Sequence, residues 1–236
     1  MNEQRDYTVY AQPGAQPGSA LAIRNKALRQ TYTLLAISLI PTVLGAWVGM
    51  ATGLNVAMAE SPGMTMIIFL VGAFGLMFGI ERTKNSSAGV GLLLLFTFFM
   101  GVMLSQMLGF VLGMGNGPQL VMLAFGGTAI IFGAMSTLAN VVKRDLTGLS
   151  KMLFVGVILL MIAGIANIWL QLPALMLTFS VVAIIIFSAF MLVDVQRVIN
   201  GGETNYITAT LAIYLDLYNV FVNLLALLGI FGGERR

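Results

Sequence analysis

Two aspartates lie inside long apolar stretches of this chain, where an ionised side chain is costly. Asp216 stands about ten residues into the last stretch, with no basic residue within one helical turn. Asp194 lies near the end of the preceding stretch, three residues before Arg197. A charge near the centre of a bilayer costs about 2.5 to 3.5 kcal/mol on insertion scales. Both aspartates are therefore candidates for a buried carboxyl group with a partner or a function.

Two amides extend the polar character of the last stretch. Asn219 and Asn223 follow Asp216 at i+3 and i+7, so the three side chains share one face of a helix. This stripe predicts a functional site with two supporting amides. An alternative explanation of the stripe is a hydrogen-bonded cluster that holds this helix against its neighbours. For Asp194 the alternative is a simple ion pair with Arg197 at the membrane surface.

The two aspartates are predicted to meet across a helical hairpin. The short loop NGGETNY joins their stretches, so the two helices are expected to be antiparallel neighbours. Two carboxyl groups that are close together in a low dielectric tend to share one proton. Protonation would then favour a closed hairpin, whereas two charges would open it or attract a cation. Ca²⁺, which prefers clustered oxygens, is the candidate metal at Asp194 and Asp216, and no other cofactor is predicted.

The composition limits the remaining chemistry. The chain contains no histidine and no cysteine, so proton transfer falls to Asp and Glu, and thiolate metal sites and disulfides are excluded. Hydrophobic residues make up 58% of the 236 residues and charged residues 9%, against about 25% charged in a soluble domain. The net charge is only +3, and the basic residues lie in short loops rather than in one patch, which gives no support for nucleic-acid binding.

The elements that must position these residues are membrane-spanning helices. Apolar stretches long enough to cross a hydrocarbon layer of about 30 Å recur along the chain. They predict an all-α polytopic bundle of seven helices, the seventh either central or re-entrant. The predicted spans are 32–53, 63–80, 90–113, 120–142, 152–170, 174–199 and 207–230.

Three regions follow from these spans. Residues 1–31 are predicted to be a flexible tail, 32–230 the membrane domain, and 231–236 a short C-terminal tail. The polar tail carries the doubled AQPG repeat at 11–18 and lacks an apolar face, so it is either a handle for a cytoplasmic partner or a passive spacer.

The basic residues predict the orientation. The loops and tail on the amino-terminal side of the spans carry 4, 2, 3 and 1 Lys or Arg, against 0, 0, 0 and 2 on the other side. Cytoplasmic loops carry the excess of positive charge, so the amino terminus is predicted to be cytoplasmic. The two arginines at the C-terminus are the exception, which is why a re-entrant seventh helix stays an alternative.

Glycines spaced along the spans predict places where helix backbones approach closely. The candidates are Gly75 and Gly79, Gly109 and Gly113, and the group Gly126, Gly127 and Gly133.

Several parts of the chain carry segments typical of one membrane-protein family. They are GPQL at 117–120 followed by GTAIIF at 127–132, KRDL at 143–146, and YLDLYNVF at 214–221. With these segments the chain resembles the Bax-inhibitor family of seven-span membrane proteins, and the resemblance covers residues 25–236. The stretches QLPAL at 171–175 and NGGETNY at 200–206 are most similar to the YccA branch of bacterial inner-membrane proteins.

The resemblance implies a function and further site residues. Family members with paired aspartates are described as pH-sensitive calcium-leak proteins, and Asp194 and Asp216 match the two positions. An arginine on the second helix belongs to the same latch, and Arg82 is the matching candidate. The YccA branch implies modulation of the membrane protease FtsH. These likenesses imply a non-enzymatic regulator in the bacterial inner membrane, with lipid and the FtsH complex as partners.

Two other classes stay open. An intramembrane aspartyl protease also uses two aspartates on adjacent helices, although the Gly-x-Gly that precedes one of them in such enzymes is missing before Asp216. A secondary transporter would show repeated halves with interrupted helices, and the sequence shows no such repeat.

Overall fold

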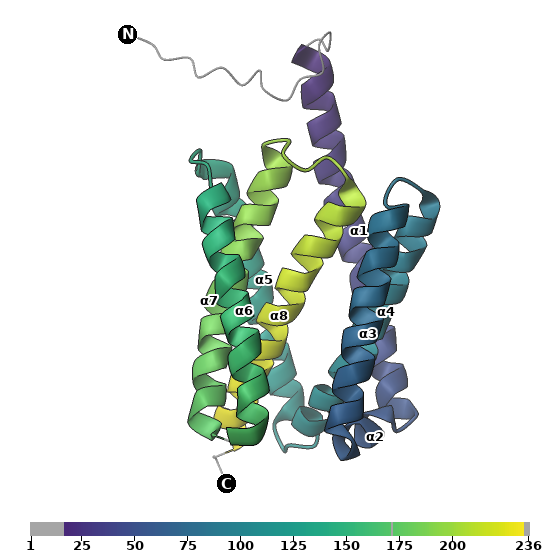
Figure 1. Ribbon diagram of the computed structural model, residues 1–236, viewed down its shortest axis with the longest axis vertical. Coiled ribbons are helices and arrows are strands. Elements are labelled where there is room, and N and C mark those ends of the chain that lie inside the picture. The colour runs from purple at the N-terminus through teal and green to yellow at the C-terminus, as the bar shows by residue number, and fades with distance from the viewer. Residues whose placement is uncertain (1–16, 171, 234–236) are drawn as a thin grey trace.

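The structure, a computed structural model, describes residues 17–170 and 172–233, and in that part of the chain it consists of helices without strands (Figure 1). The eight helices are α1 (Pro17–Ala51), α2 (Leu54–Glu60), α3 (Pro62–Thr83), α4 (Ser87–Leu112), α5 (Gly117–Val141), α6 (Thr147–Leu170), α7 (Pro173–Ile199) and α8 (Tyr206–Gly233). All except α2 are long and apolar enough to cross a membrane. The predicted all-α bundle with seven spans is confirmed.

The first helix is longer than expected. It begins at Pro17, so the part of the predicted flexible tail from 17 to 31 is helical instead. This segment is rich in Ala, Leu, Arg, Lys and Gln, which are good helix formers, and proline is tolerated in the first turn. Residues 1–16 lie outside the described part of the chain, as do residue 171 and residues 234–236. Most of the predicted partner handle therefore lies outside the described residues, as does half of the predicted C-terminal tail, whose residues 231–233 belong to the last helix.

A short helix occupies the connection between the first two spans. It begins after Gly53, whose φ of 74° lies in the left-handed region that glycine adopts without strain. Met58 is buried, and Asn55 lies against Gly109 of α4. This helix, α2, therefore packs on α4 at the end of the bundle far from the start of α1 (Figure 1).

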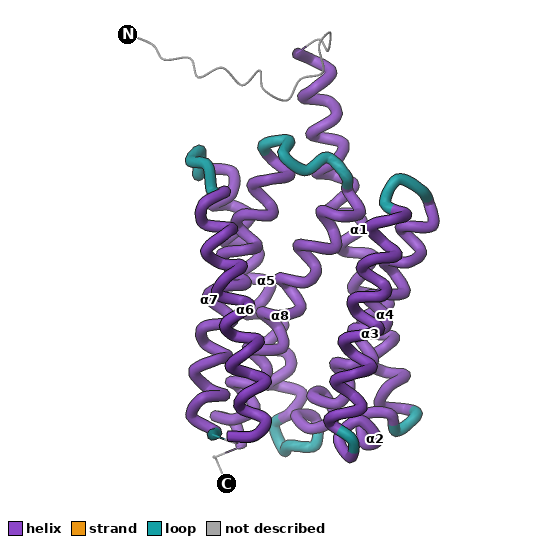
Figure 2. Tube along the Cα trace, in the orientation of Figure 1, coloured by secondary structure: helices purple, strands orange, loops and turns teal. Residues whose placement is uncertain are grey.

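The helices form two groups with α8 between them. One group contains α1 to α4 and the other α5 to α7, and α8 crosses the space between them (Figure 1). It contacts α1, α3, α4, α5 and α7, whereas α6 contacts α7 alone among the described helices. The connections are short and lie at the two ends of the bundle (Figure 2). As predicted, the last span is central. It is one unbroken helix that reaches the opposite end, so it does not re-enter.

The closest approach between helix backbones occurs between α1 and α4. A methyl group added at Gly101 would overlap the carbonyl of Thr42, and one added at Gly45 would overlap the carbonyl of Phe98. The glycines expected from sequence differ among themselves. A methyl group at Gly109 would overlap the side chain of Asn55, and one at Gly79 or Gly127 would lie 3.3 Å from a leucine side chain. At Gly75, Gly126 and Gly133 it would meet nothing within 4 Å apart from the neighbouring backbone of its own helix. Glycine spacing alone does not tell which face of a membrane helix meets a neighbour.

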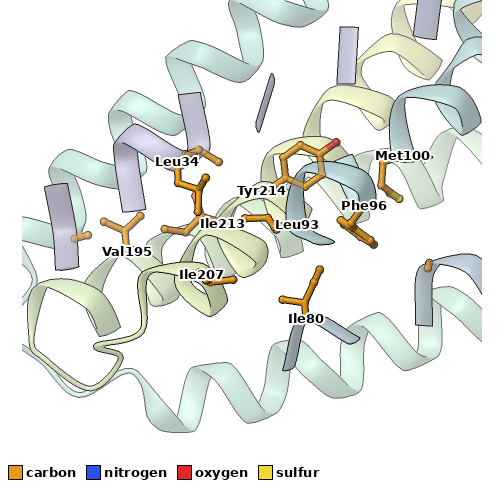
Figure 3. Close-up of a cluster of buried hydrophobic side chains, with 12 residues drawn as sticks. Leu34, Ile80, Leu93, Phe96, Met100, Val195, Ile207, Ile213 and Tyr214 are labelled. Atoms are coloured by element: carbon orange, nitrogen blue, oxygen red, sulfur yellow. The ribbon is translucent and has the colours of Figure 1, made fainter. Parts of the chain in front are cut away.

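The main core lies where α8 meets the first group of helices. Figure 3 shows buried side chains from several helices around Tyr214, which is 1% exposed. Its hydroxyl lies 2.8 Å from that of Thr42 on α1, and its ring packs edge-on against Phe96 of α4. The middle of α8 is thereby held against α1 and α4.

Candidate functional site

Asp216 lies in the interior of the bundle on α8. It is 5% exposed, and its Oδ2 is buried without a hydrogen-bond partner among the described residues. A buried polar atom without a partner is uncommon in a folded protein and calls for an explanation such as a functional role. The sequence-based expectation that this carboxyl group faces the bundle rather than lipid agrees with the structure.

Asp194 lies on α7, which packs closely on α8. Its carboxyl group is near enough to that of Asp216 for the two to interact electrostatically. Asp194 Oδ1 is 3.4 Å from Nη1 of Arg197, and the aspartate side chain is 14% exposed against 47% for the arginine. The arginine also donates a long hydrogen bond of 3.5 Å to Ser150 of α6. The structure thus contains both the ion pair and the neighbouring carboxyl group that the sequence suggested.

A third acidic residue stands at the end of the hairpin. Glu203, in the loop between α7 and α8, interacts electrostatically with Asp194. Its backbone N–H and that of Gly202 donate to the carbonyl of Arg197, which closes the end of α7. Gly201 has a φ of 75°, the left-handed conformation typical after a helix end. The carboxyl groups of Glu203, Asp194 and Asp216 therefore follow one another from the loop into the bundle.

Asn219 and Asn223 line a hollow of about 260 Å³ between α6, α7 and α8. The other lining residues are apolar or glycine, including Phe179 and Phe187 of α7. Each amide nitrogen donates back along α8 at 2.8 Å, Asn219 to the carbonyl of Leu215 and Asn223 to that of Asn219. The amides are therefore partly used within their own helix, and the face they share with Asp216 points toward α6 and α7.

The opposite face of α8 carries hydroxyl groups that the sequence analysis did not single out. Tyr214 and Tyr218 each lie two residues from Asp216, and two residues turn a helix by about 200°. The hydroxyl of Tyr218 donates to the carbonyl of Met100 on α4 at 3.2 Å, while that of Tyr214 meets Thr42 on α1. The sequence feature that could have indicated these hydroxyl groups is a pair of tyrosines, Tyr214 and Tyr218, four residues apart within an apolar span.

The start of α8 is held by Asn205. Its side-chain oxygen accepts from the backbone N–H groups of Ile207 at 3.0 Å and Thr208 at 3.3 Å, which caps the helix. Its amide nitrogen donates to the carbonyl of Lys84 and to the side chain of Asn85, both in the loop between α3 and α4. This one side chain ties two loops together at the same end of the bundle as Asp194.

Gln196 holds another loop at this end. It lies two residues after Asp194 on α7 and is buried. Its amide nitrogen donates to the carbonyls of Val142 at 2.6 Å and Arg144 at 3.1 Å, in the connection between α5 and α6. The position of this connection is therefore set by the helix that carries Asp194.

Arg82, the candidate from the family resemblance, lies on the exposed surface of α3. Its guanidinium carbon is 4.6 Å from the ring centroid of Phe78. Within the described part of the chain it forms no ion pair with either aspartate, and Arg197 is the basic residue that pairs with Asp194. Asp194 and Asp216 thus interact electrostatically, whereas Arg82 forms no ion pair with either of them in the described part of the chain.

Two charged groups outside the spans have shifted pKa values. A hydrogen bond to Glu81 raises the pKa of Lys84. Hydrogen bonds from the side chain and backbone of Thr147 to Oδ1 of Asp145, at 2.6 and 2.9 Å, lower the pKa of that carboxyl group. Lys84 is partly exposed and Asp145 is exposed, so these interactions organise the loops rather than the bundle.

Calcium binding at Asp194 and Asp216 stays a prediction. Ca²⁺ takes six to eight oxygen ligands. Among the described residues no group of three or more His, Cys, Asp or Glu side chains is placed to hold a metal.

The chain matches known proteins over most of its length. Residues 24–233 match the family described as "Inhibitor of apoptosis-promoting Bax1". The chain is 41% identical over 211 residues to "Modulator of FtsH protease YccA" of Escherichia coli (strain K12), and equally similar to "Inner membrane protein YccA" of another Escherichia coli strain, covering 89% of this chain and 93% of each relative. An uncharacterized protein of Neisseria meningitidis is 38% identical over 213 residues, with the same coverage.

Proposed function

Because this chain belongs to the family described as Inhibitor of apoptosis-promoting Bax1, we propose that it is a regulatory protein of the bacterial inner membrane that modulates the membrane protease FtsH. The relative that is 41% identical over 89% of the chain bears the name of such a modulator, and a second is named an inner membrane protein. Seven helices long enough to span a membrane support this location. The excess of basic residues on one side supports a cytoplasmic amino terminus.

The element that responds to conditions is the hairpin of α7 and α8. The observation that carries this part of the proposal is the buried Oδ2 of Asp216, which has no hydrogen-bond partner in the described part of the chain, in a carboxyl group that interacts electrostatically with that of Asp194. At low pH the two groups share a proton and the hairpin stays closed. As pH rises and the shared proton is lost, repulsion between two carboxylates favours separation of the helices.

A second candidate function is a leak for Ca²⁺ or another cation. The carboxyl groups of Glu203, Asp194 and Asp216 follow one another from a loop into the bundle, which is the arrangement that would attract a cation from solution. In this reading the deprotonated pair is the narrowest point, and the cation passes as cargo. We keep Arg82 as a residue to test, because the family resemblance points to it.

Enzyme and transporter functions fit the arrangement less well. Intramembrane aspartyl proteases carry a Gly-x-Gly before one of their two aspartates, whereas Ile213, Tyr214 and Leu215 precede Asp216. A transporter with a midplane site would have interrupted spans, and each of the seven candidate spans is a continuous helix. The function that we propose is therefore regulation without catalysis of a reaction.

The test is reconstitution with FtsH in liposomes. Degradation of a membrane substrate by FtsH is measured with and without this protein over a series of pH values. Ca²⁺ flux is measured in parallel vesicles without FtsH. We expect the protein to change the degradation rate. An unchanged rate at every pH would overturn the modulator function, and an absence of flux at every pH would overturn the leak.

A further inference from the structure

A second hollow lies at the end of the bundle where α1 begins. It has a volume of about 700 Å³ and is bounded by α1, the start of α4 and the start of α8. Its lining residues are Asn25, Lys26, Arg29, Gln30, Thr33, Leu34, Ile37, Val90 and Tyr206. Neither aspartate of the candidate site is among them, so this is a separate feature of the molecule.

The hollow lies beside contacts that join the three helices. The hydroxyl of Thr210 on α8 donates to the carbonyl of Thr31 on α1 at 3.3 Å. A methyl group added at Gly89 of α4 would lie 3.1 Å from the side chain of Ile207 on α8. These contacts hold the walls together from inside the bundle and leave the hollow open beside them.

The residues of α1 that line the hollow change from charged to apolar along the helix. Lys26 and Arg29 are exposed at the outer end, Thr33 lies one turn further in, and Leu34 and Ile37 form the inner part. From residue 26 to residue 37 a helix rises about 16 Å. A phospholipid has the same order of groups, with a charged phosphate outside and acyl chains inside, over a comparable length.

The charge of the hollow is positive. Two basic residues line it, and no acidic residue of the described chain does. In this part of the chain neither Lys26 nor Arg29 forms an ion pair, whereas Arg197 and Lys84 at the same end of the bundle are each paired with a carboxylate. Basic hollows at the membrane surface attract anionic headgroups.

We propose that the hollow between α1, α4 and α8 binds one anionic phospholipid, with its phosphate at Lys26 and Arg29 and an acyl chain along Ile37 and Val90. The hydroxyl of Tyr206 and the amides of Asn25 and Gln30 line the same hollow and supply donors for headgroup oxygens. The lipid fills the space between the three helix ends and steadies α1 against α8. This binding requires neither FtsH nor the pair of aspartates.

The experiment is native mass spectrometry of the full-length protein in detergent, titrated with phosphatidylglycerol or with phosphatidylcholine. The double variant Lys26→Gln/Arg29→Gln is compared with Lys143→Gln/Arg144→Gln, which removes two charges from a loop at the same end that does not line the hollow. We expect wild type to retain phosphatidylglycerol over phosphatidylcholine. Retention of phosphatidylglycerol should fall roughly tenfold in Lys26→Gln/Arg29→Gln and should change little in Lys143→Gln/Arg144→Gln.

Two further experiments distinguish phospholipid binding from misfolding of the variant and from binding of a free phosphate group. The charge-conserving variant Lys26→Arg/Arg29→Lys should retain the lipid, which shows that the loss does not come from misfolding. Soluble glycerol phosphate at millimolar concentration should not displace the lipid, because it lacks the acyl chain. Equal losses in the two charge-removing variants, or displacement by glycerol phosphate, would overturn the proposal.

Discussion

The hydroxyl groups of Thr42 and Tyr214 lie 2.8 Å apart in the interior of the bundle, joining α1 to α8 on the side of α8 away from Asp216. The Thr42 hydroxyl also donates to the carbonyl of Ser38 at 2.9 Å, so its lone pairs are free to accept from the tyrosine. One face of α8 is thus anchored by hydroxyl groups, while the other carries the carboxyl group and the amides.

Tyr214→Phe is expected to lower the free energy of unfolding by about 0.5 to 1.5 kcal/mol, because it removes the buried hydroxyl that bonds to Thr42 and makes a long hydrogen bond of 3.5 Å to the carbonyl of Thr97, without changing the ring. Thr42→Val removes the hydroxyl group that bonds to Tyr214 and leaves a side chain of similar volume. Thermal unfolding in detergent should show that the double variant loses less than the sum of the two single variants. Fully additive losses would mean that the two hydroxyl groups do not interact.

Gln196→Met is expected to loosen the connection between α5 and α6, because the carbonyls of Val142 and Arg144 lose their donor. Trypsin should then cleave faster after Lys143 and Arg144, which lie in that connection. Asn140→Ala is the control, since its amide bonds within α5, to the carbonyl of Ser136. Equal cleavage rates in wild type and Gln196→Met would contradict the role of Gln196.

Gly101→Ala is expected to lower the free energy of unfolding by about 1 to 3 kcal/mol, because the added methyl group would overlap the backbone of α1 at Thr42. Gly126→Ala on α5 is the matched control, because a methyl group there would meet nothing within 4 Å apart from the neighbouring backbone of its own helix. It should be neutral or slightly stabilising, since alanine favours a helix more than glycine does. The measurement is the midpoint of thermal unfolding, and equal shifts for both variants would refute the packing difference.

The carboxyl group of Asp145 is expected to titrate below its ordinary pKa of 3.8, because Thr147 donates two hydrogen bonds to the ionised form. A lowered pKa in the folded state means that the carboxylate stabilises the loop above pH 3.8 and that this contribution is lost as pH falls through the lower value. Carbon NMR of labelled aspartate gives the titration directly. Thr147→Val should return the pKa toward its ordinary value, and no change in that variant would contradict the cause.

Asp216→Asn and Asp194→Asn are expected to flatten the pH response of FtsH modulation or cation flux, since each removes one member of the pair that shares a proton. The double variant should add little to either single variant, because the two groups act as one unit. Asp145→Asn, which changes a carboxyl group in a loop, should leave the response intact. A normal pH profile in both single variants would make the pair structural.

The sequence by itself determined the all-α class, the seven spans and the two aspartates within them. These follow from local properties: a stretch of apolar residues must cross the membrane as a helix, and a carboxyl group within it must turn away from lipid. The face shared by Asp216, Asn219 and Asn223 follows equally from helical periodicity.

Only the tertiary structure decided which faces meet. In a membrane helix most faces are apolar, so the pattern of residues does not mark the side that packs on a neighbour. The close approach at Gly101, the bond between Thr42 and Tyr214 and the hollow at Lys26 and Arg29 each join helices far apart in the sequence. They depend on how the helices are placed against one another, which no local pattern specifies.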